Sequence, residues 1–174
     1  MKILFFSDVH GILDNLKYIE ELERQNNFDR IVVLGDLCSY YSYQDSIDVV
    51  EFLNKYLNKL IITRGNCDSD FVMKLINVST PDLVELNVDN KKLYLTHGHL
   101  YSYSKNKIFN NGILIYGHEH VPYIKCENDM IYICVGSISL PRGNSKPSYL
   151  IYNNHKFTLY DIEKNIVDEI IIKE

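Results

Sequence analysis

Hydrophobic positions in the first third of the chain alternate between short apolar runs and helical spacings. Residues 2–7 and 30–35 are apolar or β-branched runs of strand length. Between them, apolar residues recur every three or four positions among charges, which predicts an amphipathic helix over residues 14–26 with Asp14 as its N-cap. This rhythm is typical of βαβ units that build a parallel sheet.

A second unit of the same kind follows the first. Ile47, Val50, Leu53 and Leu57 keep helical spacing and predict a second helix. The β-branched run over residues 60–64 then predicts a third strand. We therefore expect the first three strands to lie parallel in one sheet.

The second half of the chain has a different pattern, in which β-rich runs come in pairs separated by two-residue turns. Asn and Asp fill these turns because both tolerate the positive φ that tight hairpins require. The simplest closed arrangement is two mixed sheets packed face to face with helices on their outer surfaces. We find no repeat or linker and expect residues 1–174 to form a single domain. The predicted turns are Asp89-Asn90, Asn128-Asp129 and Asn153-Asn154.

Composition narrows the class of protein. The 174 residues are 46% apolar and 24% charged, which is an ordinary globular balance. A net charge of -5 disfavours broad nucleic-acid binding, but a small anionic substrate remains compatible because bound cations reverse a local field. We expect a cytoplasmic protein, since we find neither a secretory signal nor a run of about 18 apolar residues. The four cysteines form no CxxC pair and are expected to be free thiols.

Short polar side chains follow each predicted parallel strand. Asp8 and His10 come after the first strand, Asp36 closes the second, and Asn66 follows the third. Ligand sites in open α/β sheets form beyond the carboxyl ends of the strands, where all four residues fall. Taken singly, each motif is equally compatible with an ordinary turn, because Asp, Asn and Gly are common turn residues.

Histidine placement favours a metal site over plain turns. His97 and His99 follow one apolar run, and His118 and His120 follow another. Packing does not readily explain two such pairs, whereas neutral imidazole is a common metal ligand. Strand-like alternation within the second pair would aim both rings the same way. His155, beside a predicted turn, is interpreted as a surface residue.

The candidate ligands exceed the needs of one ion. Carboxylate, amide and imidazole together suit Mn, Fe, Co, Ni or Zn. Two such ions about 3.5 to 4 Å apart hold both the attacking and the leaving oxygen at phosphorus, so hydrolysis of a phosphoester is the reaction that this set best supports. The candidates are Asp8, His10, Asp36, Asn66, His97, His118 and His120.

The ordered motifs DVHG, GDLC, RGNCD, LTHGH and GHEH are similar to those of the calcineurin-like metallophosphoesterases. The resemblance runs from Lys2 through Gly143 and is closest to the small single-domain bacterial and archaeal phosphodiesterase branch. It implies a four-layer αββα sandwich of two mixed β-sheets flanked by helices. It also implies two divalent metal ions, with Mn preferred over Ni, Zn, Fe or Co, and in-line attack of a metal-bridging hydroxide on a small phosphodiester.

The resemblance further implies a division of the ligands between the two ions. One ion would be held by Asp8, His10 and His120. The other ion would be held by Asn66, His97 and His118. Asp36 would bridge the two ions.

Some residues depart from the family pattern. Cys67 stands where many relatives have His, so the donor of the leaving-group proton is unassigned. Cys67 could donate a proton, although packing is the preferred interpretation, and His99 is the alternative donor. Glu119 replaces the usual Thr, and alternation predicts that it points away from the metals. The short segment after His99 predicts an irregular loop where relatives often have a helix, and Arg142 is either a phosphate contact or a surface residue.

Two other functions stay open. A protein-binding scaffold is one, because the retromer scaffold subunit resembles this fold but has an altered metal site. A phosphomonoesterase, such as a phosphoprotein phosphatase, is the other. The complete ligand set favours an enzyme, and the short chain favours small phosphodiesters. A homo-oligomer is compatible with the sequence, which identifies neither the natural substrate nor the physiological metal.

Overall fold

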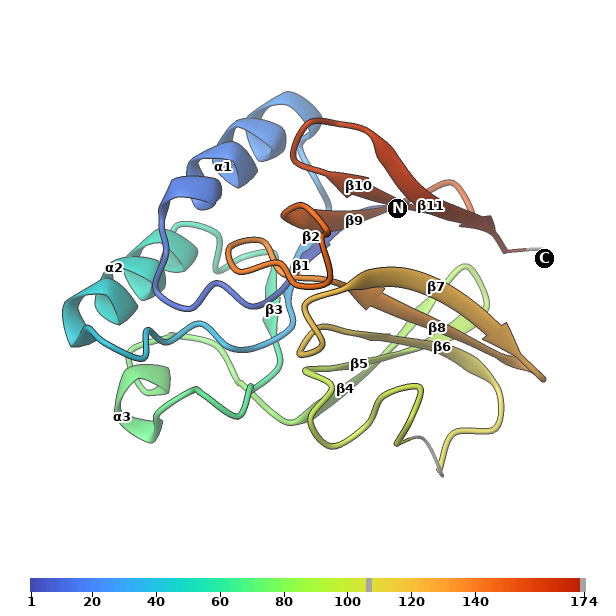
Figure 1. Ribbon diagram of the computed structural model, residues 1–174, viewed down its shortest axis with the longest axis horizontal. Helices are drawn as coiled ribbons and strands as arrows, with labels where there is room; N and C mark the ends of the chain where they lie inside the picture. Colours follow the sequence, from blue (N-terminus) through green and yellow to red (C-terminus); the bar gives the residue numbers. More distant parts are fainter. Residues whose placement is uncertain (106–107, 173–174) are drawn as a thin grey trace.

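The computed structural model describes residues 1–105 and 108–172, and two mixed sheets pack face to face in it (Figure 1). The six-stranded sheet has the order β11-β10-β9-β1-β2-β3, in which β1, β2 and β3 are parallel and β9 runs antiparallel to β1. Its strands are β1 (Lys2–Phe6), β2 (Arg30–Val33), β3 (Leu60–Ile62), β9 (Ser148–Asn153), β10 (Lys156–Asp161) and β11 (Ile166–Ile171).

The five-stranded sheet has the order β4-β5-β6-β8-β7. Its three central strands are parallel, and each edge strand forms an antiparallel hairpin with its neighbour. The prediction of two mixed sheets, parallel early in the chain and rich in hairpins later, is therefore confirmed. These strands are β4 (Leu83–Val88), β5 (Lys91–Thr96), β6 (Gly112–Tyr116), β7 (Pro122–Glu127) and β8 (Met130–Val135).

Three helices follow the three parallel strands. They are α1 (Asp14–Asn26), α2 (Tyr43–Asn54) and α3 (Asp70–Met73). The predicted N-cap of α1 is wrong, because Leu13 holds the cap position and Asp14 is the first helical residue, where its negative charge favours the helix N-terminus. Leu57 lies beyond the end of α2 and is 37% exposed. No helix in the described part of the chain is long and apolar enough to span a membrane.

The core has two main layers, and β1 contributes to both. Leu4 and Phe6 pack under the helices on one face of the six-stranded sheet, whereas Ile3 and Phe5 pack between the two sheets. All four side chains are fully buried. Burial on both faces explains why the early strands are continuous apolar runs rather than alternating ones.

The outer face of the five-stranded sheet has an aromatic cover. The rings of Tyr94 and Phe109 lie 4.0 Å apart, and Tyr101 packs edge-on against Phe109 at 5.6 Å. The segment between β5 and β6 that supplies Tyr101 and Phe109 is irregular in its described residues, as predicted. Within residues 1–105 and 108–172, helices cover the six-stranded sheet, and this aromatic loop covers the other sheet.

The last predicted turn is displaced by one residue. Asn153 is the final residue of β9 and pairs with Lys156, so the turn consists of Asn154 and His155. Both turn residues have a positive φ, 48° and 62°. His155 is half-buried there. The other two predicted turns lie between β4 and β5 and between β7 and β8, as expected.

Candidate metal centre

The parallel strands continue as paired loops beyond their carboxyl ends. The backbone N–H of Asp8 donates to Gly35 O at 3.1 Å, and the N–H of His10 donates to Asp36 O at 2.9 Å. These bonds keep the loop after β1 beside the loop after β2. Asp8, His10 and Asp36 are thus held at one edge of the sandwich, and all three are buried.

A first cluster forms where the loop after β6 meets the loop after β1. His120 Nε2 lies 3.1 Å from Asp8 Oδ1, and His10 Nε2 lies 3.7 Å from the same oxygen. One donor atom from each residue falls within 4.8 Å of the others. Because these donors are two imidazoles and a carboxylate, the cluster has the chemistry of a divalent-metal site.

A second cluster lies beside the first. His97 Nε2 is 3.2 Å from Asp36 Oδ2, 3.2 Å from His118 Nδ1 and 3.1 Å from Asn66 Oδ1. Asp36 Oδ2 also lies 3.7 Å from His10 Nε2, so this carboxylate faces both clusters. The structure therefore brings together all seven predicted ligands, whose role in metal binding stays a prediction.

Unpaired polar atoms show that the first cluster fits a cation. Asp8 Oδ1 and His10 Nδ1 are buried, and neither has a hydrogen-bond partner among the described residues. Facing imidazole nitrogens lie 3.4 Å apart between His10 and His120. A buried carboxylate oxygen without a donor is costly unless a positive charge compensates it. The donor set therefore fits divalent metal ions.

Ionisation in the centre also favours cations. Burial opposes the charged form of Asp8, but contacts with His10 and His120 outweigh it and lower the pKa of Asp8. Burial is likewise outweighed at Asp36, where the hydrogen bond and charge of His97 lower the pKa. Both carboxylates are therefore ionised at neutral pH.

The backbone of the centre is strained. Five of the predicted ligands have a left-handed φ, although none is glycine. Residues in this region cost about 1–3 kcal/mol each and cluster at functional sites. These residues and their φ angles are Asp8 (57°), His10 (50°), Asp36 (53°), His118 (62°) and His120 (61°).

The same angles overturn the expected alternation within the second histidine pair. His118 and His120 lie in a bend rather than a strand, and their rings belong to different clusters. Glu119, between them, accepts a hydrogen bond from Tyr123 Oη at 2.9 Å. Its carboxylate is thus engaged with β7, consistent with the prediction that it points away from the metals.

Asp68 is a functional residue that the sequence analysis missed. Its buried carboxylate accepts four backbone hydrogen bonds, from the N–H groups of Asp36, Leu37, Cys38 and Gly65, at 2.7 to 3.1 Å. Asp68 therefore fixes the loop that carries the carboxylate shared by both clusters. Its only signal in the sequence is its place at the end of the RGNCD motif.

Ser137 connects two predicted ligands of the first cluster. Its buried hydroxyl donates to Asp8 O at 2.8 Å and accepts from the N–H groups of Ser139 and Leu140. The carbonyl of Leu140 in turn accepts from Nδ1 of His120, which leaves Nε2 facing Asp8. Partners of this kind orient the ring of a ligating histidine.

We expect Ser137→Ala to weaken metal binding at the first cluster by roughly 10- to 100-fold, because the loop that orients His120 loses its anchor. Titration calorimetry of the metal-free protein measures this affinity. Ser148→Ala is the matched control, since Ser148 is a buried serine that donates to Val135 O at 2.7 Å and contacts neither cluster. Equal affinities in the two variants would contradict the role of Ser137.

Gly65 allows the loop after β3 to approach Asp36. A Cβ atom at position 65 would overlap Asp36 N and Oδ1. Backbone cannot yield there as a flexible side chain would, so we expect Gly65→Ala to displace the shared carboxylate and weaken metal binding at least about tenfold. Metal content after dialysis tests this, and a wild-type content would count against it.

The two candidate proton donors lie at different places. Cys67 Sγ hydrogen-bonds to Tyr40 Oη at 2.8 Å, and burial is the main reason that the pKa of Cys67 is raised to about 12. The ring of His99 lies 5.5 Å from that of His97 and 6.2 Å from that of His118. Burial and the nearby charge of His97 lower the pKa of His99. Neither residue is established as the donor.

Arg142 lies at the rim of the first cluster. Its backbone N–H donates to His120 O at 3.0 Å, and its side chain is exposed. Both interpretations from the sequence, a phosphate contact or a surface residue, remain compatible with this position.

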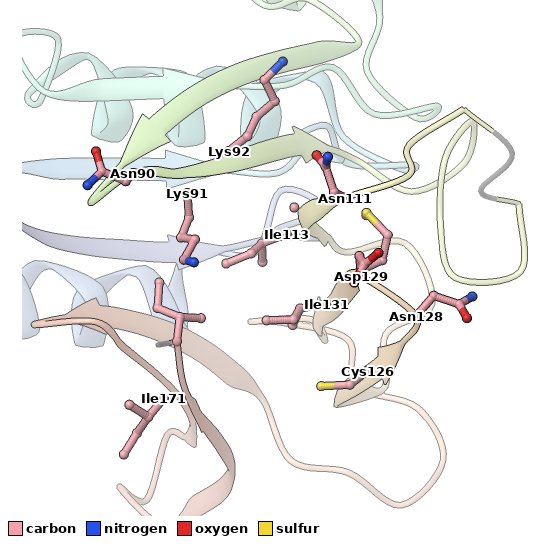
Figure 2. Close-up of a pocket in the computed structure, with 13 residues that line it drawn as sticks. Asn90, Lys91, Lys92, Asn111, Ile113, Cys126, Asn128, Asp129, Ile131 and Ile171 are labelled. Atoms are coloured by element: carbon pink, nitrogen blue, oxygen red, sulfur yellow. The ribbon is translucent and has the colours of Figure 1, made fainter. Parts of the chain in front are cut away.

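Two cavities differ in their relation to the clusters. One of about 440 Å³ adjoins His118 and is bordered by Tyr103, Lys105 and Lys125. A larger one of about 810 Å³ lies at the opposite edge, where β5, β6 and β8 begin (Figure 2). Asp129 and Cys126 line the larger cavity, but the described residues place no candidate metal-binding group there. The larger cavity is therefore remote from the chemistry.

Comparison with known families agrees with the geometry. Residues 1–156 match the calcineurin-like phosphoesterase superfamily domain. The chain belongs to this family, and the resemblance inferred from the motifs is confirmed.

Individual relatives are bacterial and archaeal phosphodiesterases. Phosphodiesterase YfcE of Escherichia coli strain K12 is 30% identical over 182 residues, covering 99% of this chain and 98% of the relative. A solved structure of YfcE superposes with a TM-score of 0.91, at 29% identity, over 99% of this chain and 100% of that one. Phosphodiesterase MJ0936 of Methanocaldococcus jannaschii is 29% identical over 145 residues, covering 78% of this chain and 83% of that protein.

A protein named for vacuolar sorting shares the fold. Vacuolar protein sorting 29 from Cryptosporidium parvum superposes with a TM-score of 0.69 at 19% identity, over 98% of each chain. At that identity the likeness concerns the fold alone.

Proposed function

We propose that this protein is a metal-dependent phosphodiesterase with two divalent cations, Mn²⁺ in the first place, at the paired clusters. The observation that carries the proposal is Asp36, whose carboxylate faces His10 of one cluster and His97 of the other. In this assignment Asp36 is the bridging ligand. Asp8, His10 and His120 complete one site, and Asn66, His97 and His118 complete the other.

When bound, two such cations supply hydroxide near neutral pH and offset the charge that develops on the phosphoryl oxygens. The chain's own residues hold the geometry for this reaction. Asp36 is oriented by the N–H of Cys67 at 2.9 Å, and Asp8 by the N–H of His118 at 2.9 Å. His97 Nδ1 donates to Leu34 O at 2.7 Å, which turns its Nε2 toward Asp36.

The substrate assigned here is a small phosphodiester. Two relatives are named phosphodiesterases, which supports this subclass. The net charge of -5 argues against a nucleic-acid polymer as substrate. A cytoplasmic location, a single domain and a homo-oligomeric assembly remain predictions.

The scaffold alternative is disfavoured by the complete donor set. A binding surface does not require carboxylates and imidazoles converging within 4.8 Å of one another in buried positions. Side chains of this kind, strained and partly unpaired, are expected where metals act in chemistry.

The proposal is tested by removing metal with a chelator and restoring Mn²⁺, Ni²⁺, Zn²⁺, Fe²⁺ or Co²⁺ separately. We expect Mn²⁺ to restore hydrolysis of bis(p-nitrophenyl) phosphate, with a kcat/KM at least about tenfold above that for p-nitrophenyl phosphate, a difference of about 1.4 kcal/mol. Absence of turnover with every metal would contradict the assignment as an enzyme. A preference for the monoester would contradict the assignment as a phosphodiesterase.

A further inference from the structure

Four aromatic side chains of the described residues are exposed, and one of them, Tyr40, lies against the candidate metal centre. The chain has 14 Tyr and 7 Phe, most of which are buried or half-buried. The exposed ones in the described residues all lie in the loop between β2 and α2, at the start of α2, or in α3. They are Tyr40 (61% exposed), Tyr41 (98%), Tyr43 (51%) and Phe71 (62%).

Tyr40 directly covers a predicted metal ligand. Its ring is stacked on the buried ring of His10, with centroids 5.0 Å apart and planes at 18°. Its hydroxyl is hydrogen-bonded to Cys67 Sγ at 2.8 Å. The ring is thus fixed at two points, one on the loop after β1 and one on the loop after β3, and its exposure is not a consequence of a loose side chain.

Tyr40 is largely exposed although one face of its ring rests on His10. The residue is 61% exposed, so much of its surface is available to a ligand. Tyr41 stands edge-on to it, at 6.3 Å and 62°, and extends the aromatic surface. Two adjacent exposed rings are an unfavourable arrangement in water unless they meet a partner.

We infer that the Tyr40–Tyr41 pair stacks a nucleobase of the substrate, so that the enzyme acts on small nucleotide phosphodiesters. This inference rests on the proposed function. Because Tyr40 lies against His10, its ring borders the centre at which a phosphodiester would be held. Among groups commonly joined through phosphodiesters, a nucleobase offers a flat π-face for an uncharged aromatic ring. The negative net charge favours short nucleotides over polymers.

Two chromogenic substrates separate this inference from the chemistry. Thymidine 5′-(p-nitrophenyl phosphate) and methyl p-nitrophenyl phosphate release the same leaving group and differ only in the other ester group. Because stacking on an aromatic side chain favours a base strongly, we expect the thymidine ester to have a kcat/KM about 10- to 100-fold higher. The ratio of the two values is the measurement, so loss of overall activity in a variant does not obscure it.

Variants of Tyr40 identify which part of the side chain acts. Tyr40→Leu removes the ring and is expected to bring the ratio close to one. Tyr40→Phe keeps the ring and loses the bond to Cys67, so it is expected to keep most of the ratio. Phe71→Leu is the matched control, since Phe71 pairs with Tyr43 at 5.3 Å and makes no ring contact with a predicted ligand in the described residues.

Binding provides a readout that is independent of turnover. In saturation-transfer NMR, the base protons of thymidine 5′-monophosphate are expected to receive magnetisation from the zinc-loaded protein. The signal should persist in Phe71→Leu and fall at least about threefold in Tyr40→Leu.

The outcomes distinguish the two levels of the proposal. Turnover of neither ester with any metal would overturn the proposed function. Turnover of both esters with equal kcat/KM, or a high ratio that survives Tyr40→Leu, would overturn the nucleobase site while leaving the phosphodiesterase intact.

Discussion

Replacing Asp36 by alanine is expected to lower the kcat for bis(p-nitrophenyl) phosphate by more than about 10³-fold. Loss of one stabilising group at a reacting centre typically costs 10²- to 10³-fold, and Asp36 serves both clusters. The bound metal per chain should fall as well, because the proposed bridging ligand is lost. Steady-state kinetics and elemental analysis of the same preparation measure the two effects.

Asp129→Ala is the matched control for this prediction. Asp129 is an exposed aspartate at the opposite edge of the sandwich, beside the larger cavity. We expect this variant to keep both its metal content and its activity. Full activity in Asp36→Ala would contradict the assignment of the bridging ligand.

Replacing Asp68 by alanine is expected to produce the largest loss of stability. Four backbone N–H groups would lose their acceptor in a buried loop. Each unsatisfied buried donor costs about 1–3 kcal/mol, although water that enters the vacated space will satisfy some of them. We expect the free energy of unfolding to fall by about 3–5 kcal/mol, measured by urea denaturation of the metal-free protein.

Two further variants define the cause of that loss. Asp161→Ala removes a buried carboxylate that accepts bonds from Asn165 N and Nδ2 and belongs to neither cluster, and should cost about 1–2 kcal/mol without changing metal affinity. Asp68→Asn keeps the shape and one acceptor oxygen and should fall between wild type and Asp68→Ala. An unchanged stability in Asp68→Ala would show that the loop does not depend on this carboxylate.

The sequence was most informative where burial imposed a simple pattern. The strands β1 and β2 are buried on both faces, so they appear as continuous apolar runs and their positions were predicted to within two residues. The bounds of α1 were predicted because one face packs on the core through Leu16, Ile19 and Leu22. Because β1 and β2 were expected to be parallel, Asp8 and Asp36, which follow them, were expected at the same edge of the sheet.

Errors arose where backbone geometry is decided by tertiary contacts. Asn153 and Asn154 are equally suited to a turn. Only the pairing of Asn153 with Lys156 places Asn153 in the strand and leaves Asn154 in the turn. Residue type alone does not predict the left-handed φ of His118 and His120, since histidine adopts this region more often than most residues but still in a minority of cases. The expectation of strand-like alternation between His118 and His120 was therefore wrong, although both histidines lie in the candidate metal centre as predicted.

Supporting residues were harder to predict than candidate ligands. Asp, His and Asn are common metal ligands, so their residue types alone indicated candidates. Asp68 instead acts by accepting hydrogen bonds from a loop about 30 residues away in the sequence. Tyr40 depends likewise on two loops that meet only in the folded chain. Such contacts follow from how the loops pack, and no spacing in the sequence encodes them.

The most direct test of the central claim is the rate of bis(p-nitrophenyl) phosphate hydrolysis as Mn²⁺ is added stepwise to metal-free protein. Two sites that share Asp36 predict a rate that rises with added metal and reaches its plateau at about two equivalents per chain. A rate that stays at background at every ratio of metal to protein would contradict a two-metal phosphodiesterase.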